Sequence, residues 1–349
     1  MRKGPEQAAA SGAAAHAPNP LLEVRNLTVR FEMLRRTVHA VNGVSFNVHE
    51  GETYAIVGES GCGKSVTALS LLKLLSMPPA RITDGSVYFD GQDLLELPET
   101  RLQNLRGPAV SYVFQEPMTS LNPSMKIGWQ IAESCAKHFG MNREKALSRA
   151  REVLEQVQLP DADERLNSYP HQLSGGMRQR IMIAIALVCS PRLLIADEPT
   201  TALDVTIQAQ ILDLLSDLQK RTGAGMILIT HDLAVVAEYA DRMMVMYAGR
   251  KVEEGPVDAI LSNPRHPYTR GLLQAVPRLG SSLSENSEQS LSEIPGIVPL
   301  LDRPFTGCPF APRCESATER CRNETPPTVE FGDGRLSACI LSESAGARE

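Results

Sequence analysis

The sequence predicts an α/β domain with a mostly parallel sheet core, an attached antiparallel β layer and a small Cys-rich extension at the C-terminal end. Short apolar runs, typical of strands covered on both faces, alternate with longer segments of helical periodicity, which favours a parallel sheet. Two β-rich segments at the start follow one another with no helix between them, which favours an antiparallel layer. Four of the seven cysteines lie in a Pro-rich segment near the end of the chain.

The expected elements follow from the spacing of apolar residues. Alternation predicts a strand over residues 22–31 and a second over 38–48, and a continuous apolar run predicts a buried strand over 53–57. Glycines then precede a helical pattern over 66–75. Further short strands are expected over 110–114, 193–196, 226–229 and 243–246, and helices with a 3.6-residue period over 142–157 and 204–218.

The composition narrows the classes of function. The 349 residues are 42% hydrophobic and 22% charged, which is ordinary for a globular protein and excludes a disordered or collagen-like chain. The net charge of -6 disfavours a surface that coats nucleic acid, so we expect no nucleic-acid partner. The longest apolar run, residues 181–189, is far shorter than the roughly 18 residues that span a bilayer and predicts a buried helix.

Composition also changes at both ends of the predicted domain. Residues 1–20 are Ala-rich, and because alanine is too weakly apolar to form a signal core, we expect a disordered tail. A Ser-rich stretch over 279–293 is typical of a linker. Seven cysteines without a signal segment indicate a reducing compartment. Among them, Cys62 is expected to be a small side chain in a loop, and Cys135 and Cys189 to be small buried side chains; none of the three is expected to be a ligand.

A phosphate-binding loop is predicted between the strand at 53–57 and the helix that follows. The pattern G-x-x-x-x-G-K-[ST] is met in full between a strand and a helix, which is its confirming context. Its glycines let backbone N–H groups converge on phosphate oxygens at a helix N-terminus. Lys64 adds a charge for the β- and γ-phosphates, and Ser65 offers a hydroxyl to Mg²⁺. The loop consists of Gly58, Glu59, Ser60, Gly61, Cys62, Gly63, Lys64 and Ser65.

Two carboxylates follow the strand at 193–196. Asp197 is expected at the C-terminal edge of the sheet, near the phosphates, where it would orient Mg²⁺. Glu198 would act as the general base that polarises an attacking water. A second anion-binding helix start is predicted at Ser174, Gly175 and Gly176. Its economical use is in trans, with two subunits arranged head to tail.

In these motifs and their order, residues 22–255 resemble the ATP-binding subunits of ABC transporters. The resemblance implies a P-loop ABC-type nucleotide-binding domain over 21–262, with a helical signature subdomain over about 116–185. The signature lies at residues 173–177, where Met177 replaces the commonest glutamine. The resemblance further implies that the Q-loop Gln115 contacts Mg²⁺ and the attacking water, and that the switch His231 contacts the γ-phosphate. It also implies that Asp204, in the D-loop, lines the dimer interface and that Ser174 acts in trans. Phe31 would stack on adenine, with a core aromatic as the alternative.

The tail resembles a segment of the oligopeptide, dipeptide and nickel permease ATPases. The matching stretches begin at His266 and Cys308, and we expect an extension over 263–349. In relatives of this branch, four such cysteines bind a 4Fe–4S cluster, which the resemblance implies here for Cys308, Cys314, Cys321 and Cys339. Four thiolates in a Pro-rich coil suit such a cluster, whereas zinc usually shows closer cysteine pairs. Zinc and free thiols stay open as alternatives.

The resemblance implies an ATPase that powers an importer of peptides, with nickel, opines or oligosaccharides as alternative cargo. Its expected partners are two transmembrane permease subunits, a second ABC ATPase subunit in a heterodimer and, indirectly, an extracytoplasmic substrate-binding protein. The expected location is the cytoplasmic face of the inner membrane, as a peripheral protein. Two rivals remain: a soluble ABC ATPase of DNA repair or translation, and a regulatory subunit that binds ATP without hydrolysing it.

Overall fold

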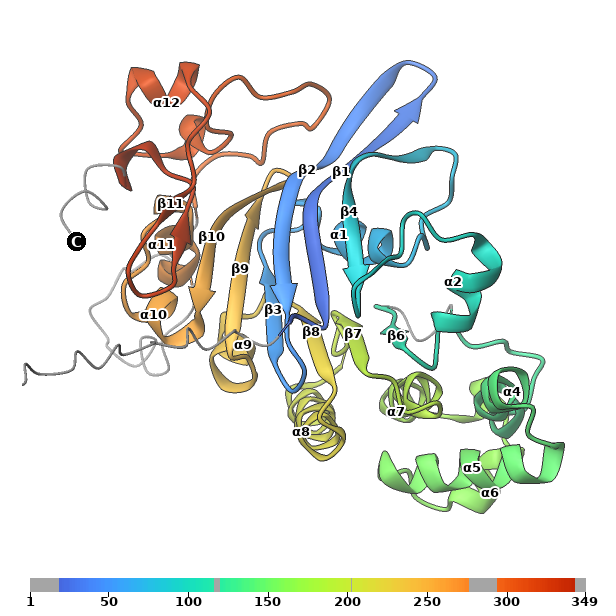
Figure 1. Cartoon of the computed structure of the whole chain (residues 1–349). Coiled ribbons are helices and arrows are strands. Elements are labelled where there is room, and N and C mark those ends of the chain that lie inside the picture. The colour runs from blue at the N-terminus through green and yellow to red at the C-terminus, as the bar shows by residue number, and fades with distance from the viewer. Residues whose placement is uncertain (1–18, 116–119, 202, 276–293, 343–349) are drawn as a thin grey trace, which may run out of the picture.

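The computed structural model describes residues 19–115, 120–201, 203–275 and 294–342. Within these residues the larger sheet has the strand order β11-β12-β10-β9-β3-β8-β7-β6 (Figure 1). The strands β9, β3, β8, β7 and β6 are mutually parallel, and β10 to β12 continue the sheet in antiparallel pairing. The bounds are β3 Thr53–Val57, β6 Val110–Val113, β7 Leu193–Asp197, β8 Gly225–Ile229, β9 Arg242–Tyr247, β10 Arg250–Pro256, β11 Val329–Glu330 and β12 Leu336–Ser337.

A smaller antiparallel sheet, with the order β2-β1-β4-β5, packs beside the first. It contains β1 Leu22–Met33, β2 Arg36–Val48, β4 Ala80–Phe89 and β5 Gln92–Asp93. The first two strands confirm the expected β layer, whereas β4 was not predicted. Its alternation is broken at Gly85, where the register with β1 shifts, and a Cβ there would come within 2.7 Å of the carbonyl oxygen of Arg25.

Hydrophobic clusters cover both faces of the parallel strands. On one face, α1 (Lys64–Leu71) and the small sheet bury alternate strand residues such as Ile56 and Ile195. On the other face, α7 (Gly175–Leu187) and α8 (Val205–Thr222) cover their neighbours Leu194 and Leu228. Successive strand residues point to opposite faces of the sheet, so both faces must be covered. The α/β fold class is therefore confirmed. Two short helices complete this part, α2 Glu99–Leu105 and α9 Leu233–Tyr239.

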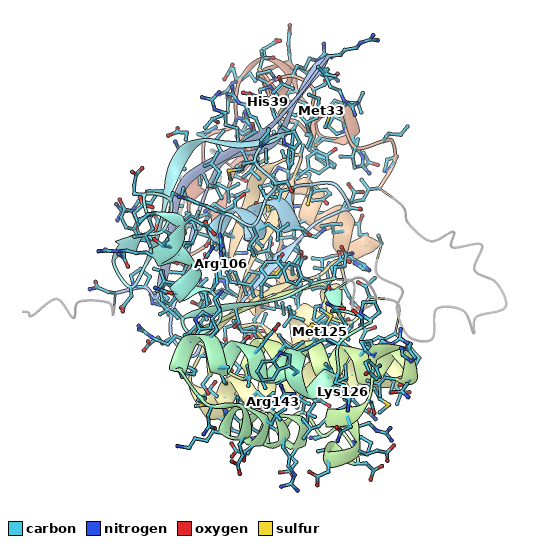
Figure 2. The ribbon with its side chains drawn as sticks, turned by 90° about the vertical axis from the view of Figure 1, so that its right-hand side faces the viewer. Met33, His39, Arg106, Met125, Lys126 and Arg143 are labelled. Carbon is cyan, nitrogen blue, oxygen red and sulfur yellow. The ribbon has the colours of Figure 1, made fainter. Side chains whose placement is uncertain are left out.

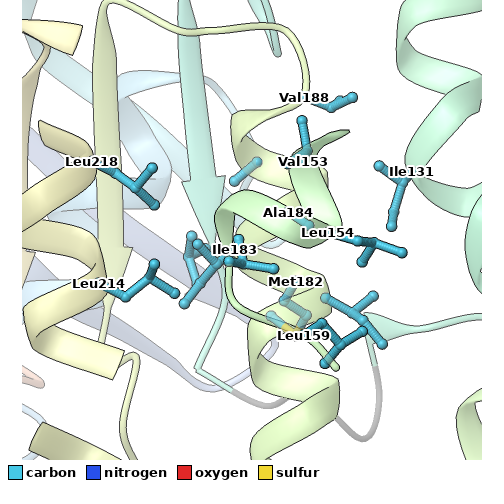
Figure 3. Close-up of a cluster of buried hydrophobic side chains, with 14 of the residues drawn as sticks. Ile131, Val153, Leu154, Leu159, Met182, Ile183, Ala184, Val188, Leu214 and Leu218 are labelled. Carbon is cyan, nitrogen blue, oxygen red and sulfur yellow. The ribbon is translucent and has the colours of Figure 1, made fainter. Parts of the chain in front are cut away.

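A helical region is inserted between β6 and β7 (Figure 1). It comprises α4 Ile127–Phe139, α5 Arg143–Gln156 and α6 Ala162–Asn167, together with α7. Figure 3 shows its buried side chains converging from several helices, among them Ile131, Val153 and Ile183. In Figure 2, Lys126 and Arg143 mark this region at the opposite end of the molecule from Met33.

The C-terminal extension has only a small core of its own. Its buried cluster consists of Ala311, Cys321 and Ile340. The segment docks on the larger sheet, because β12 pairs with β10 and Phe310 joins a cluster that includes residues of β3, β9 and β10. Beyond β10, the described residues include the α-helices α10 Val257–Ser262, α11 Pro267–Gln274 and α12 Glu319–Asn323.

Most predicted elements occur in the structure with shifted ends. The helix expected over 66–75 instead runs from Lys64 to Leu71, because Lys73 adopts a positive φ of 50° and its ammonium group bonds the carbonyls of Leu95 and Leu97. The expected linker over 279–293 and residues 1–18 of the expected tail lie outside the described residues.

Candidate functional site

The candidate site lies at the carboxyl edge of the parallel strands. The phosphate loop follows β3, Asp197 ends β7, and His231 comes shortly after β8. Gln115 follows β6 on the same edge. Because β3, β6, β7 and β8 run in the same direction, residues from four distant parts of the chain meet here.

Close packing of the phosphate loop accounts for its glycines. Gly58 has a φ of 149°, and a Cβ there would lie 2.3 Å from the carbonyl oxygen of Met246. Gly63 has a φ of 104°, and a Cβ there would lie 2.5 Å from the carbonyl oxygen of Ala40. Side chains at these positions would therefore clash with the backbone, and the loop can bend tightly into α1 only with glycine. The thiol of Cys62 is fully buried.

Lys64 folds back onto its own loop in this structure. Its ammonium group donates to the carbonyl of Gly58 at 2.7 Å and to that of Glu59 at 3.2 Å. The residue is 5% exposed, so these carbonyls replace water around a buried charge. An arriving phosphate would offer stronger, charged acceptors to the same group.

Ser65, the last residue of the loop, forms a hydrogen bond with Asp197. The Ser65 hydroxyl donates to Oδ1 of Asp197 at 3.0 Å, and the hydroxyl of Tyr112 donates to Oδ2 at 2.7 Å. Burial raises the pKa of Asp197, while these two hydrogen bonds act in the opposite direction. A hydroxyl and a carboxylate side by side are the hard oxygen ligands that Mg²⁺ prefers, so these residues fit the ion.

The neighbouring Glu198 is held by two donors and faces a histidine. Gln115 Nε2 donates to Oε2 of Glu198 at 2.7 Å, and the Thr201 hydroxyl donates to the same oxygen at 3.0 Å. His231 Nδ1 lies 3.5 Å from Oε1. Glu198 has a positive φ of 45°, and its N–H donates to the carbonyl of Ile229 at 2.9 Å. The structure thus brings together the three side chains to which sequence reasoning assigned catalysis.

Ser174 and Asp204 instead cap two neighbouring helices. The Ser174 side chain accepts from the N–H of Met177 at the start of α7, and that of Asp204 accepts from the N–H of Ile207 at the start of α8. A Cβ on Gly176 would lie 3.0 Å from Ile207, so the two helix starts are in close contact. Among the described residues, no hydrogen bond or ion pair joins Ser174, Gly175 or Gly176 to the phosphate loop of the same chain.

Phe31 lies on β1 of the antiparallel sheet, paired with Val38 on one side and Ala80 on the other. Its side chain is partly exposed. This location is compatible with both interpretations offered for it and favours neither.

The four cysteines of the extension line a single small cavity together with His266. All are free thiols, and burial raises the pKa of Cys308 to about 11 and also raises those of Cys314 and Cys339. Across the described residues, no three His, Cys, Asp or Glu side chains are arranged to hold a metal ion. The four sulfurs have the right chemistry for a cluster, but in this geometry they form no metal-holding group, so the iron–sulfur prediction is not confirmed.

Sequence reasoning missed several residues that shape the site. Tyr112 had been assigned only to a strand, and nothing local to it indicates a bond to Asp197. Tyr268 and Arg313 lie in the stretches of the tail that begin at His266 and Cys308, but the sequence assigned no role to either residue. Both contact Glu59 of the phosphate loop. No signal in a single sequence reveals such contacts, because they depend on how distant segments pack.

Comparison with known proteins settles the family. The family profile described as "ABC transporter" matches residues 41–201. A putative peptide import ATP-binding protein of Brucella melitensis is 51% identical over 334 residues, which cover 94% of this chain and 99% of that protein. The chain belongs to the ABC transporter family. A second profile, "Oligopeptide/dipeptide transporter, C-terminal region", matches residues 252–321, which places the extension of this ABC protein in the same branch.

Other similar proteins agree with this placement of the ABC chain. The oligopeptide transport ATP-binding protein OppD of Bacillus subtilis is 51% identical over 90% of this chain and 86% of its own length. The dipeptide transport ATP-binding protein DppD of the same organism is 49% identical over 93% and 95%. Among solved structures, the ATP-binding cassette MJ0796, a dimer in a post-hydrolysis state with ADP and Pi, aligns with a TM-score of 0.61 at 29% identity and covers 68% of this chain and 98% of that one.

The comparisons thus confirm the resemblance on which the sequence predictions were based. In the residues that the structure describes, no helix is long and apolar enough to cross a membrane.

Proposed function

We propose that this chain is the ATP-hydrolysing subunit of an ABC importer for peptides. The observation that carries the proposal is the contact of Gln115 and His231 with Glu198, one residue after the Asp197 carboxylate that bonds Ser65. This arrangement sets a base for water beside a site for a metal-bound triphosphate. The peptide cargo is supported by the names of the relatives and by the second profile.

In this mechanism Lys64 exchanges its two carbonyl partners for oxygens of the β- and γ-phosphates of ATP. Ser65 and Asp197 would hold Mg²⁺, which neutralises phosphate charge when it is bound. Glu198 takes the proton of the attacking water as the oxygen–phosphorus bond forms and the bond to ADP breaks. Gln115 orients that water, and His231 stabilises charge on the γ-phosphate.

We further propose that Ser174, Gly175 and Gly176 act in trans. They cap α7 away from their own phosphate loop, so they are free to close over a nucleotide that a second ABC ATPase subunit holds. Asp204, at the adjacent helix start, would line the same interface. The similar cassette solved as a dimer supports this arrangement. The proposed pair is a heterodimer that drives two membrane-embedded permease subunits from the cytoplasmic face of the membrane and serves an extracytoplasmic binding protein.

The decisive experiment compares ATP turnover of the assembled complex with and without Glu198→Gln. The substitution keeps the side chain's size but removes the base, so we expect turnover to fall by roughly 10²- to 10⁴-fold while ATP still binds. Glu50→Gln is the matched control, because Glu50 precedes β3 at the opposite edge of the sheet and is ion-paired to Arg192. Unchanged turnover in Glu198→Gln would refute the assigned base.

The iron–sulfur cluster remains a separate proposal, supported by the gathering of four thiols around one cavity. Anaerobic purification followed by iron, sulfide and zinc analysis tests it. We expect about four iron atoms per chain if a cluster forms, since four thiolates bind one cluster of that type. A colourless protein without iron would refute it, and zinc alone would favour the alternative.

A further inference from the structure

The C-terminal extension makes a direct ion pair with the phosphate loop. Arg313 donates from one guanidinium nitrogen to Oε2 of Glu59 at 2.7 Å and from the other to Oε1 at 3.0 Å. The two residues are 254 positions apart in sequence. Only 4% of the Arg313 side chain and 26% of the Glu59 side chain are exposed, so the pair is shielded from most of the solvent. Such a bidentate pair defines both distance and orientation.

Arg313 is itself immobilised by the extension. Its Nε donates to the carbonyl of Pro295 at 3.0 Å, and one terminal nitrogen also donates to that of Ile294 at 3.0 Å. The guanidinium carbon lies 5.8 Å from the centroid of the Tyr247 ring. These contacts define the position of the guanidinium plane independently of Glu59. The loop is therefore positioned relative to the extension.

Tyr268 supplies a second contact to the same loop residue. The backbone N–H of Glu59 donates to its hydroxyl oxygen at 2.9 Å. The Tyr268 ring is fully buried, with centroids 4.6 Å from that of Tyr247 and 5.4 Å from that of Phe310. Aromatic packing thus holds the hydroxyl in place from α11.

The backbone carbonyl of Glu59 points toward the predicted phosphate-binding residues. Its carbonyl accepts from Lys64, the side chain assigned to the β- and γ-phosphates. Glu59 is thereby bonded to the extension through its carboxylate and its N–H, and to Lys64 through its carbonyl. The carbonyl cannot move without disturbing contacts that originate in the extension.

We propose that Arg313 and Tyr268 are positioning residues for ATP binding, which hold the phosphate loop in its binding geometry through Glu59. The inference rests on the proposed function, because it assumes that this loop binds ATP. A loop held in place loses less conformational freedom when the triphosphate arrives, and this raises affinity. The extension is then part of the nucleotide site rather than an independent appendage.

The test is a double-mutant cycle on the purified full chain, with MgATPγS binding measured by calorimetry. Arg313→Gln and Glu59→Gln are each expected to raise the dissociation constant roughly threefold to tenfold, and the double variant no further than the weaker-binding single variant. Arg313→Lys should recover part of the loss, because one ammonium group replaces a two-point contact. Arg320→Gln is the matched control, since Arg320 pairs with Glu324 on the surface of the same extension.

Two outcomes would overturn the proposal. Unchanged affinity in Arg313→Gln would show that the pair does not position the loop. Additive losses in the double variant would show that Arg313 acts through folding of the extension and not through Glu59. Tyr268→Phe provides an independent measurement, because it keeps the ring but removes the acceptor of the Glu59 N–H, and it should also weaken binding.

Failure of the proposed function gives a different result. Lys64→Ala is expected to abolish MgATPγS binding, whatever Arg313 does. If the wild type bound no nucleotide, or if Lys64→Ala bound it as well as the wild type, the ATP site itself would be wrong. Loss of binding in Lys64→Ala together with unchanged affinity in Arg313→Gln would refute the positioning role alone.

Discussion

At the scale of the residue, the Asp197 carboxylate shows how a charge is kept in the interior. The residue is 4% exposed, and its two oxygens each accept a hydroxyl hydrogen bond, one from Ser65 and one from Tyr112. Tyr112 can reach it because β6 and β7 are adjacent and in register. Removing one donor would leave a buried charged oxygen without a partner, which is costly.

Tyr112→Phe is therefore expected to lower the free energy of unfolding by about 1.5–3 kcal/mol, the range for a hydrogen bond to a charged group. Urea denaturation of the purified chain measures the change. Tyr239→Phe makes the same chemical change where the hydroxyl donates to the exposed Asp213 at 2.8 Å, and its effect should stay below about 0.5 kcal/mol. Equal effects in the two variants would contradict this account of Asp197.

At the scale of the element, α11 begins at a buried polar junction. His266 caps the helix, because its Nδ1 accepts from the N–H of Tyr268 at 3.1 Å. The buried carboxylate of Glu253 on β10 accepts from the backbone N–H groups of Arg265 and His266. Burial lowers the pKa of His266 to about 3, so the capping ring is neutral. This junction fixes the direction of the helix that carries Tyr268.

The depressed pKa of His266 predicts a specific pH dependence of stability. Below about pH 6.5 the unfolded chain binds a proton at His266 that the folded chain binds only near pH 3, so stability falls as the pH falls. Between pH 6.5 and 5 the wild type should lose about 1.5 kcal/mol more unfolding free energy than His266→Asn. Asparagine keeps an acceptor at the cap but does not titrate.

Denaturation curves at the two pH values provide this measurement. Parallel losses of stability in the two proteins would show that His266 does not titrate between the folded and unfolded states. His171→Asn is the matched control, because it makes the same substitution at an exposed histidine elsewhere in the chain. The contribution of His266 is the part of the pH-dependent loss that is absent in His266→Asn but present in this variant.

At the scale of the whole molecule, the extension depends on the rest of the chain for its burial. Its own buried cluster has three members, whereas Phe310 packs into the aromatic group of Tyr247 and Tyr268. The extension also reaches the antiparallel sheet, since the N–H of His39 donates to the carbonyl of Leu301 at 2.7 Å. It thus contacts both sheets and the phosphate loop.

Phe310→Ala should therefore loosen the extension while the ATPase core stays folded. Truncating a buried phenylalanine costs about 3–5 kcal/mol, and here the loss falls on a segment with little core of its own. We expect faster hydrogen exchange and earlier proteolysis in the 294–342 region, with β7 and α8, which contribute nothing to the Phe310 cluster, unaffected. Leu300→Ala, at a side chain that is 74% exposed, is the control. If Phe310→Ala and Leu300→Ala showed the same hydrogen exchange and proteolysis in the 294–342 region, the dependence of the extension on Phe310 would be contradicted.

The positions of the main site residues could be predicted from the sequence because each is encoded locally. A glycine pattern between a strand and a helix identified residues 58–65, and an apolar run ending in two carboxylates identified Asp197 and Glu198, whereas His231 was identified from the resemblance to the family. The parallel arrangement of those runs then required them to meet at one edge of the sheet. Strand β4 was missed because a bulge at Gly85 interrupts the alternation that marks a strand.

The sequence by itself determined which residues could bind and hydrolyse ATP, since backbone freedom, charge and periodicity are properties of short segments. Only the tertiary structure decided their partners: Tyr112 for Asp197, 85 positions away, and Arg313 for Glu59, 254 positions away. It also decided that the four cysteines surround a cavity without forming a metal-holding arrangement. The physical reason is that these contacts depend on distances between side chains from distant segments, and those distances arise only when the sheets, helices and extension pack together.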